Sequence, residues 1–280
     1  MKARSVHKGP LAKLPRLLWR LVRVGFKIET EFRTDFWMSV LNFLAWNALY
    51  ITFWQAIVGR TGSLGTWTAG ELLVLNFTLS VQGALSIPFL GLRRLPEKVR
   101  EGALDKYLCR PVNPIVVTCF ESMYVVSFLR SLAVALAGVG ACLWIFQLRV
   151  TAWRALLAVL LALLAVLLAL IATLVWACLQ GTVSLLSFWM GKVGTIGFFL
   201  NVGRRFERYP IDVFPRAARV TLTWFVPAAL TGTYPAMVLL GKPLDLGLTF
   251  AVALILLGIW GGVLAFVSGM ALRRYEAYGG

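Results

Sequence analysis

Long uncharged apolar segments constrain the fold of this chain more than any other feature. The stretch LLAVLLALLAVLLALIATL, within residues 154–178, consists almost entirely of leucine, alanine and valine. About 20 consecutive apolar residues form a helix that is long enough to cross the hydrocarbon core of a bilayer. The apolar runs of this chain are continuous rather than alternating, which disfavours a β-barrel. The sequence therefore predicts an all-α integral membrane protein.

Composition agrees with this prediction. Charged residues make up 14% of the 280 residues, against about 25% in a typical soluble domain, and the mean hydropathy is +0.79. Apolar runs of the required length predict about six transmembrane helices, at residues 36–58, 71–92, 115–146, 154–178, 181–202 and 246–270. We treat residues 36–280 as one membrane domain.

The N-terminal region has a different pattern. Residues 1–10 are predicted to be a disordered tail, and residues 11–35 an amphipathic helix. Its basic residues are spaced by three and four positions: Lys13, Arg16, Arg20, Arg23 and Lys27. Trp19 and several leucines lie beside this basic stripe, as in helices that bind the membrane surface, where each cation contributes about 1 kcal/mol. The alternative is that the helix packs against the cytoplasmic side of the protein itself.

The basic residues also predict the orientation. The net charge is +16; the first 35 residues carry nine Lys or Arg, and residues 93–110 carry six. Basic residues gather in cytoplasmic loops, so we expect a plasma (inner) membrane protein with cytoplasmic N- and C-termini rather than a nucleic-acid-binding protein. Five arginines at 204–219 would then be extracellular if 181–202 is a full span. Alternatively, 181–202 is a re-entrant hairpin and 204–219 stays inside.

Motifs for catalysis are missing from the sequence. The two Gly-Lys pairs, at 191–192 and 241–242, lack the upstream glycine and the following Ser or Thr of a phosphate-binding loop. The chain has one histidine, His7, and its four cysteines show no C-x-x-C spacing. We therefore expect no enzymatic activity, no bound cofactor and no metal site; ATP and Mg²⁺ would need a separate subunit.

A charged segment, EGALDKYLCRPVNP at residues 101–114, separates the second and third predicted spans. Leu104 and Leu108 share one helical face, and Asp105 and Arg110 supply polar contacts. Pro111 ends the helix. A short amphipathic helix of this kind on the inner side is typical of a docking element.

This segment resembles a pattern in the permease subunits of type 2 ATP-binding-cassette (ABC) exporters, more narrowly in a poorly characterised six-span branch. The pattern is G-x-L-D-x-x-L-x-x-P-x-x-P, which here is formed by Gly102, Leu104, Asp105, Leu108, Pro111 and Pro114. Two other stretches are similar to the same branch: GSLGTWTAGELL before the second span, and the ending ERYPIDVFP…FVPAALTGTYPAMVLL…RRYEAYG. The resemblance therefore covers the chain from about residue 25 to its end.

The resemblance implies both a fold and a function. Residues 95–110 would hold a coupling helix that docks on an ABC ATP-binding subunit through Gly102, Leu104, Asp105, Leu108, Arg110 and Pro111. Residues 209–240 would form re-entrant helices before the last span. The chain would pair with a second permease chain, identical or related, and export a substrate whose identity the sequence does not narrow. The alternative from another class is an ATP-independent carrier, channel or membrane scaffold.

Polar residues inside the predicted spans have two interpretations. A charge such as Arg130, in the third span, costs about 2.5–3.5 kcal/mol at the bilayer centre. In the first interpretation, Arg130 pairs structurally or extends its side chain to the membrane surface. In the second, it lines a dimer interface or a substrate path. The amide residues of the first two spans are interpreted as interhelical hydrogen bonds rather than substrate ligands: Asn42, Asn47, Gln55, Asn76 and Gln82.

Overall fold

The computed structural model of the chain describes residues 19–20, 23–24, 26–27, 33–102, 117–118, 124–145, 152–190 and 193–274. Regular structure in these ranges is helical, apart from one isolated bridge between Leu64 and Trp67. The α-helices are α2 (Arg33–Thr61), α3 (Ala69–Ser86), α4 (Leu95–Arg100), α7 (Val125–Ile145), α8 (Ala152–Leu185), α9 (Ser187–Met190), α10 (Gly194–Arg204), α11 (Arg216–Trp224), α12 (Ala228–Thr231), α13 (Thr233–Leu240) and α14 (Leu246–Arg274). Three 3₁₀ helices connect them: η1 (Ile87–Arg94), η2 (Arg205–Arg208) and η3 (Ile211–Val213). The predicted all-α fold is confirmed for these residues.

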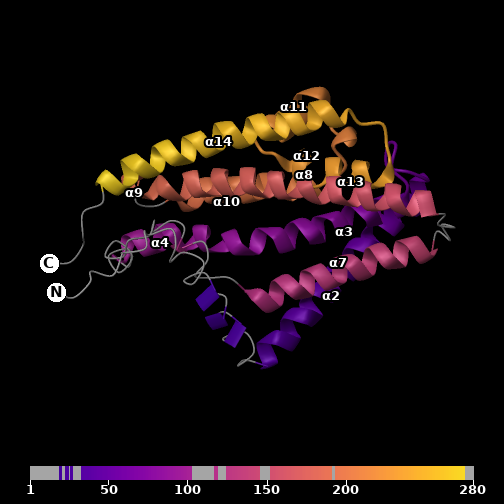
Figure 1. Cartoon of the computed structure of the whole chain (residues 1–280), viewed down its shortest axis with the longest axis horizontal. Helices are drawn as coiled ribbons and strands as arrows, with labels where there is room; N and C mark the ends of the chain where they lie inside the picture. Colours follow the sequence, from indigo (N-terminus) through magenta and orange to yellow (C-terminus); the bar gives the residue numbers. More distant parts are fainter. Residues whose placement is uncertain are drawn as a thin grey trace, which may run out of the picture.

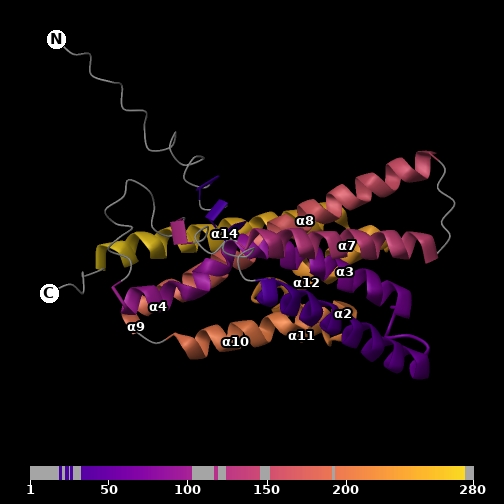
Figure 2. The same ribbon diagram turned by 90° about the horizontal axis from the view of Figure 1, so that it is seen from below.

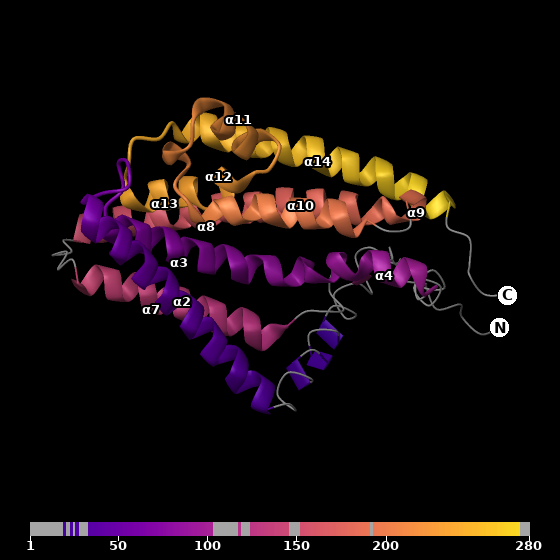
Figure 3. The same cartoon turned by 180° about the vertical axis from the view of Figure 1, so that it is seen from behind.

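The long helices form an elongated bundle with two distinct ends (Figures 1 and 3). At one end lie α4, α9 and the last turn of α14; we call this the α4 end. At the other lie the connection between α2 and α3 (residues 62–68) and the connection between α13 and α14 (residues 241–245); we call this the loop end. Helix α8 packs along both α14 and α13, and its buried side chains form one core cluster with theirs, among them Leu168, Val175, Val238 and Leu256.

Helices α3, η1 and α4 form one helical arm of 32 residues, Ala69–Arg100. A capping box begins it, because Thr68 accepts a hydrogen bond from the Glu71 amide while the Glu71 carboxylate accepts one from the Thr68 amide. Pro88 lies at the start of the 3₁₀ segment, where its missing N–H favours a departure from regular α-helix. At 1.5 Å per residue the arm is about 48 Å long, which exceeds the roughly 30 Å hydrocarbon core of a bilayer.

Helix α8 corrects the predicted boundary between the fourth and fifth spans. The sequence suggested a span at 154–178 and another at 181–202, but α8 continues through Gly181 to Leu185. A β-carbon at Gly181 would lie 3.0 Å from Leu264 Cδ1 of α14, so this glycine allows a close helix contact instead of ending the helix. The following α10 has 11 residues, about 16 Å, and is too short to cross a membrane (Figure 2).

Length and hydropathy qualify three described stretches as membrane spans: Ala69–Arg100, Leu156–Met190 and Leu246–Ala271. The pair Arg216–Trp224 and Ala228–Leu240, bent by 73°, would be a fourth if it forms a single span. The predicted count of about six is therefore not reached within the described part of the chain. Helices α2 and α7 correspond to the predicted spans 36–58 and 115–146, with α7 beginning only at Val125.

The segment from η3 to α13 starts and finishes at the loop end. Asp212 accepts a hydrogen bond from the Trp67 indole at 3.2 Å. Past α13, Lys242 donates to the Thr66 carbonyl at 2.9 Å and pairs with Glu71 at 3.0 Å, its ammonium 4.1 Å from the centre of the Trp67 ring. Both ends of this segment, which overlaps the expected re-entrant region 209–240, therefore contact the same short stretch before and at the start of α3.

Candidate functional site

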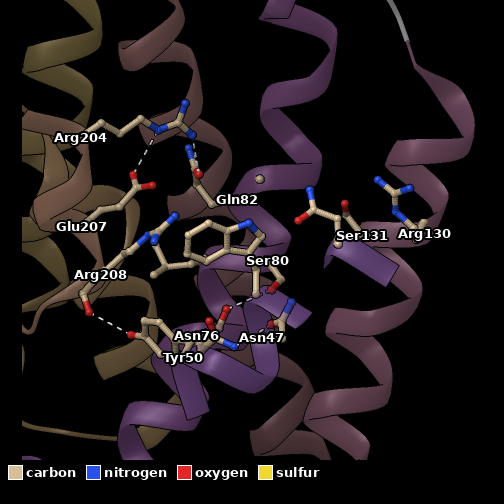
Figure 4. A pocket seen from close by; sticks show the side chains of 14 residues that line it. Asn47, Tyr50, Asn76, Ser80, Gln82, Arg130, Ser131, Arg204, Glu207 and Arg208 are labelled. Carbon is tan, nitrogen blue, oxygen red and sulfur yellow. Dashed lines mark hydrogen bonds and ion pairs between the residues drawn. The ribbon is translucent and has the colours of Figure 1, made fainter. Parts of the chain in front are cut away.

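A polar cavity of about 420 Å³, open to the surface of the bundle, lies between α2, α3, α7 and the junction of α10 with η2 (Figure 4). Its polar lining consists of amide, hydroxyl and charged side chains: Asn42, Asn47, Tyr50, Asn76, Ser80, Gln82, Arg130, Ser131, Arg204, Glu207 and Arg208. Trp46, Leu79 and Gly83 complete it. Buried polar groups are rare in apolar bundles, so this concentration marks the cavity as the leading candidate site.

The 3₁₀ turn after α10 positions the charged part of this lining. A 3₁₀ helix brings residues three apart onto one side, and here the Arg204 guanidinium meets the Glu207 carboxylate at 3.3 Å. Thr231 of α12 donates a second hydrogen bond to Glu207 at 3.1 Å. Gly232 permits this approach, because a β-carbon there would lie 2.4 Å from the Glu207 carbonyl oxygen. The turn therefore packs against α12.

Arg204 also connects two other helices of the bundle, α3 and α8. Its terminal nitrogen donates to Gln82 Oε1 of α3 at 2.9 Å, and its guanidinium carbon lies 5.3 Å from the centre of the Trp176 ring of α8. Only 15% of the Arg204 side chain is exposed. A charge at this depth is stabilised by its carboxylate partner, its amide partner and the aromatic face together.

Arg208 has a different environment, since it forms no ion pair with a described residue. Its guanidinium lies 5.9 Å from the centre of the Trp46 ring of α2, and its backbone carbonyl accepts a hydrogen bond from Tyr50 at 2.9 Å. Nearby, Asn76 donates to Asn47 at 2.8 Å and thereby connects α3 with α2. Arg130 and Ser131 contribute to the cavity wall from α7.

A second cavity, of about 600 Å³, lies toward the α4 end. Its polar lining comes from the arm, α8 and α10, and includes Arg93, Glu97, Arg100, Gln180, Ser184 and Asn201. A small cavity of about 20 Å³ lies between the two, lined by Arg204 from the first cavity and by Arg93 and Gln180 from the second. Arg204 and Trp176 therefore stand where the two larger cavities approach one another.

The predicted docking residues lie at the α4 end or outside the described residues. Gly102 follows α4 with φ of +66°, a left-handed conformation that glycine adopts without strain. The other docking residues are outside the described ranges: Leu104, Asp105, Leu108, Arg110 and Pro111.

Three of the five predicted membrane-surface cations are described, and all three are helical: Arg20, Arg23 and Lys27. The Arg23 guanidinium lies 5.9 Å from the centre of the exposed Trp19 ring, as expected one helical turn away. Lys13 and Arg16 lie outside the described residues.

The sequence did not predict that Arg204, Glu207 and Arg208 line a cavity; it placed the arginines of 204–219 outside the spans, on one side of the membrane or the other. The sequence did contain a signal for the ion pair, because an arginine and a glutamate three residues apart, as at 204 and 207, can pair within one helical turn. The interpretation of Asn47 and Asn76 as interhelical partners is confirmed by their hydrogen bond. Gln82 also bonds across the bundle, but to an arginine of the cavity rather than to a polar residue of another predicted span.

Apolar helices that enclose polar cavities and are long enough to cross a bilayer define a helical integral membrane protein. The sequence model of the ABC-2 family transporter proteins matches residues 44–279, so the chain belongs to this family of membrane transport permeases. This confirms the resemblance drawn from the sequence motifs. Neither the curated proteins nor the solved structures contained a match.

Proposed function

We propose that this permease is the membrane-spanning subunit of an ABC exporter. A separate ATP-binding subunit docks at the α4 end from the cytoplasm, binds ATP and Mg²⁺, and drives efflux of a substrate through a dimer of permease chains. The permease itself performs no catalysis. Permeases of the ABC-2 family generally work with such a subunit, which supports this assignment.

The observation that carries the proposal is the way the helical arm is anchored at the α4 end. Leu95 and Val99 of α4 are buried in one cluster with Leu185 at the end of α8 and Ala271 near the end of α14. A force applied to the segment after Gly102 would therefore reach α3, α8 and α14 together. Such rigid coupling is what an ATP-driven change in the spans requires.

Polar cavities within the bundle support transport over a purely structural role. A scaffold gains nothing from arginine, glutamate and amide side chains inside a membrane bundle, where each charge costs several kcal/mol unless it is paired. A transport route for a polar or charged group needs such residues. The cavities on both sides of Arg204 are consistent with a transport route that is closed at Arg204 in the present conformation.

Co-purification tests the proposal directly. The tagged full-length permease is extracted gently from its own membranes, and bound ATP-binding subunit is quantified by mass spectrometry. We expect a stoichiometric ATPase with the wild type and a loss of more than about tenfold with Leu104→Asp or Leu108→Asp, because each change places a charge in a buried apolar contact. Lys106→Gln is the matched control, since it changes the net charge equally on the opposite helical face.

The outcomes separate the alternatives. If no ATPase co-purifies with ATP, with ADP or without nucleotide, the exporter proposal is wrong and an ATP-independent carrier or scaffold takes its place. If Lys106→Gln loses as much of the bound ATP-binding subunit as the leucine variants do, docking is not specific to the face that carries Leu104 and Leu108. A second, related permease in the complex would indicate a heterodimer, and its absence a homodimer.

A further inference from the structure

An apolar cavity of about 310 Å³ adjoins the polar one. It is lined by Trp46, Leu49, Tyr50, Phe53, Trp54, Arg208 and Tyr209. Trp46, Tyr50 and Arg208 line both cavities. An aromatic compartment and a polar compartment therefore meet at a single guanidinium, which packs over an indole ring that belongs to both.

Two residues of the polar compartment, Arg208 and Gln82, have donor groups that are not used by the described residues. Among the described residues of its lining, Glu207 is the one carboxylate, and it is already bound by Arg204 and Thr231. Arg208 forms no ion pair with a described residue. The Gln82 side chain is only 1% exposed, and its Nε2 has no hydrogen-bond partner among the described residues.

Two donor groups indicate the chemistry of a ligand: the exposed guanidinium of Arg208 and the buried Nε2 of Gln82. A buried donor without a partner is unfavourable, and an acceptor ligand removes that cost. Arginine pairs with carboxylate, phosphate or sulfonate oxygens through two parallel hydrogen bonds, whereas a cation would be repelled here. The apolar compartment beside these donors suits a hydrophobic or aromatic body, which would stack on Trp46 and Phe53.

We infer that the joined cavities bind an anionic amphiphile, with its acidic group at Arg208 and Gln82 and its apolar body along α2. This inference rests on the proposed export function and names the class of the exported substrate. Arg208 selects for charge because it stands at the boundary of the compartments. Arg204 holds the floor of the site through Gln82 and Glu207, and Arg130 borders the polar compartment from α7 (Figure 4).

The test measures probe binding to the purified full-length permease, without ATPase, in nanodiscs of zwitterionic phosphatidylcholine. The probes are pyrenebutyrate, which is anionic, and pyrenebutanol, its neutral counterpart, and tryptophan-to-pyrene energy transfer reports binding. We expect Arg208→Gln to weaken pyrenebutyrate binding by about tenfold and pyrenebutanol binding much less, since the lost interaction is a charge-assisted hydrogen bond. Arg208→Lys, which keeps the charge, should retain part of the affinity.

Arg205→Gln is the matched control: Arg205 is the exposed neighbour within η2 and lines none of the cavities. Equal binding of the two probes, or equal loss in the Arg205 and Arg208 variants, would overturn the inference. Phosphatidylglycerol added to the nanodisc identifies the source of the ligand. Displacement of pyrenebutyrate supports a lipid in the site, and retention supports a soluble amphiphile. Because no ATPase is present, this assay can fail while the docking experiment succeeds, and the reverse also holds.

Discussion

At the scale of single residues, a small set of side chains determines how charge is placed inside this bundle. Arg204 contacts Glu207, Gln82 and Trp176, which belong to η2, α3 and α8. The charges of Arg204 and Glu207 stabilise each other, because both side chains are about 85% buried. Breaking a buried ion pair leaves an uncompensated charge, which is more harmful than removing both partners.

We therefore predict that Glu207→Gln destabilises the protein by about 3 kcal/mol, because Arg204 keeps its charge and loses its carboxylate partner. The double variant Arg204→Gln/Glu207→Gln should recover part of this loss. Thermal unfolding of the detergent-solubilised protein, followed by tryptophan fluorescence, measures both. Arg205→Gln, on the exposed side, should change stability by less than about 0.5 kcal/mol. If the stability losses of Arg204→Gln and Glu207→Gln simply add in the double variant, the two residues are not directly coupled.

At the scale of elements, contacts between segments far apart in the sequence hold the loop end together. Lys242, after α13, binds Thr66 and Glu71 and lies over the Trp67 ring, while Asp212 accepts a hydrogen bond from the same indole. Trp67 is fully buried between them. The α2–α3 connection thereby fixes both ends of the segment that contains α11, α12 and α13.

Lys242→Met should loosen this attachment, since it removes the ion pair and the cation over the indole while keeping a long apolar side chain. We expect faster amide hydrogen exchange in residues 62–71 and in α13, by about tenfold, with α8 unchanged. Hydrogen exchange with mass spectrometry resolves these peptides. Arg60→Met is a suitable control, because Arg60 is an exposed cation at the end of α2. Equal acceleration in that variant would show that the Lys242 contacts do not hold the segment.

At the scale of the whole molecule, the bundle has two distinct ends: the α4 end, where the helical arm finishes, and the loop end (Figure 1). If the α4 end faces the cytoplasm, as the positive-inside rule predicts, the loop end faces outward. The polar cavity and the cavity toward the α4 end then lie one behind the other between the two faces of the membrane, with Arg204 and Trp176 between them. This orientation gives the docking proposal and the substrate proposal a common geometry.

Single cysteines on a background without the native thiols test the orientation. Ser63→Cys, in the α2–α3 connection, should react with a membrane-impermeant maleimide in intact cells. Glu101→Cys, just after α4, should react only after permeabilisation; both positions are exposed. Labelling of Glu101→Cys in intact cells would reverse the assigned orientation.

The sequence by itself determined the all-α membrane class and the family, because long apolar runs and ordered motifs are local properties of the chain. The sequence also predicted interhelical hydrogen bonds for the amide residues of the first two spans, and this is confirmed for Asn47 and Asn76.

Only the tertiary structure decided where α8 ends and what the arginines after α10 contact. The sequence suggested that a new span begins at Gly181, but α8 continues through this residue, and its missing β-carbon accommodates Leu264 of α14. Arg204 acquires its partners from α3, α8 and η2, and no spacing in the sequence brings Gln82 or Trp176 near it. Such contacts depend on how helices pack, and packing is a property of the assembled bundle rather than of any one segment.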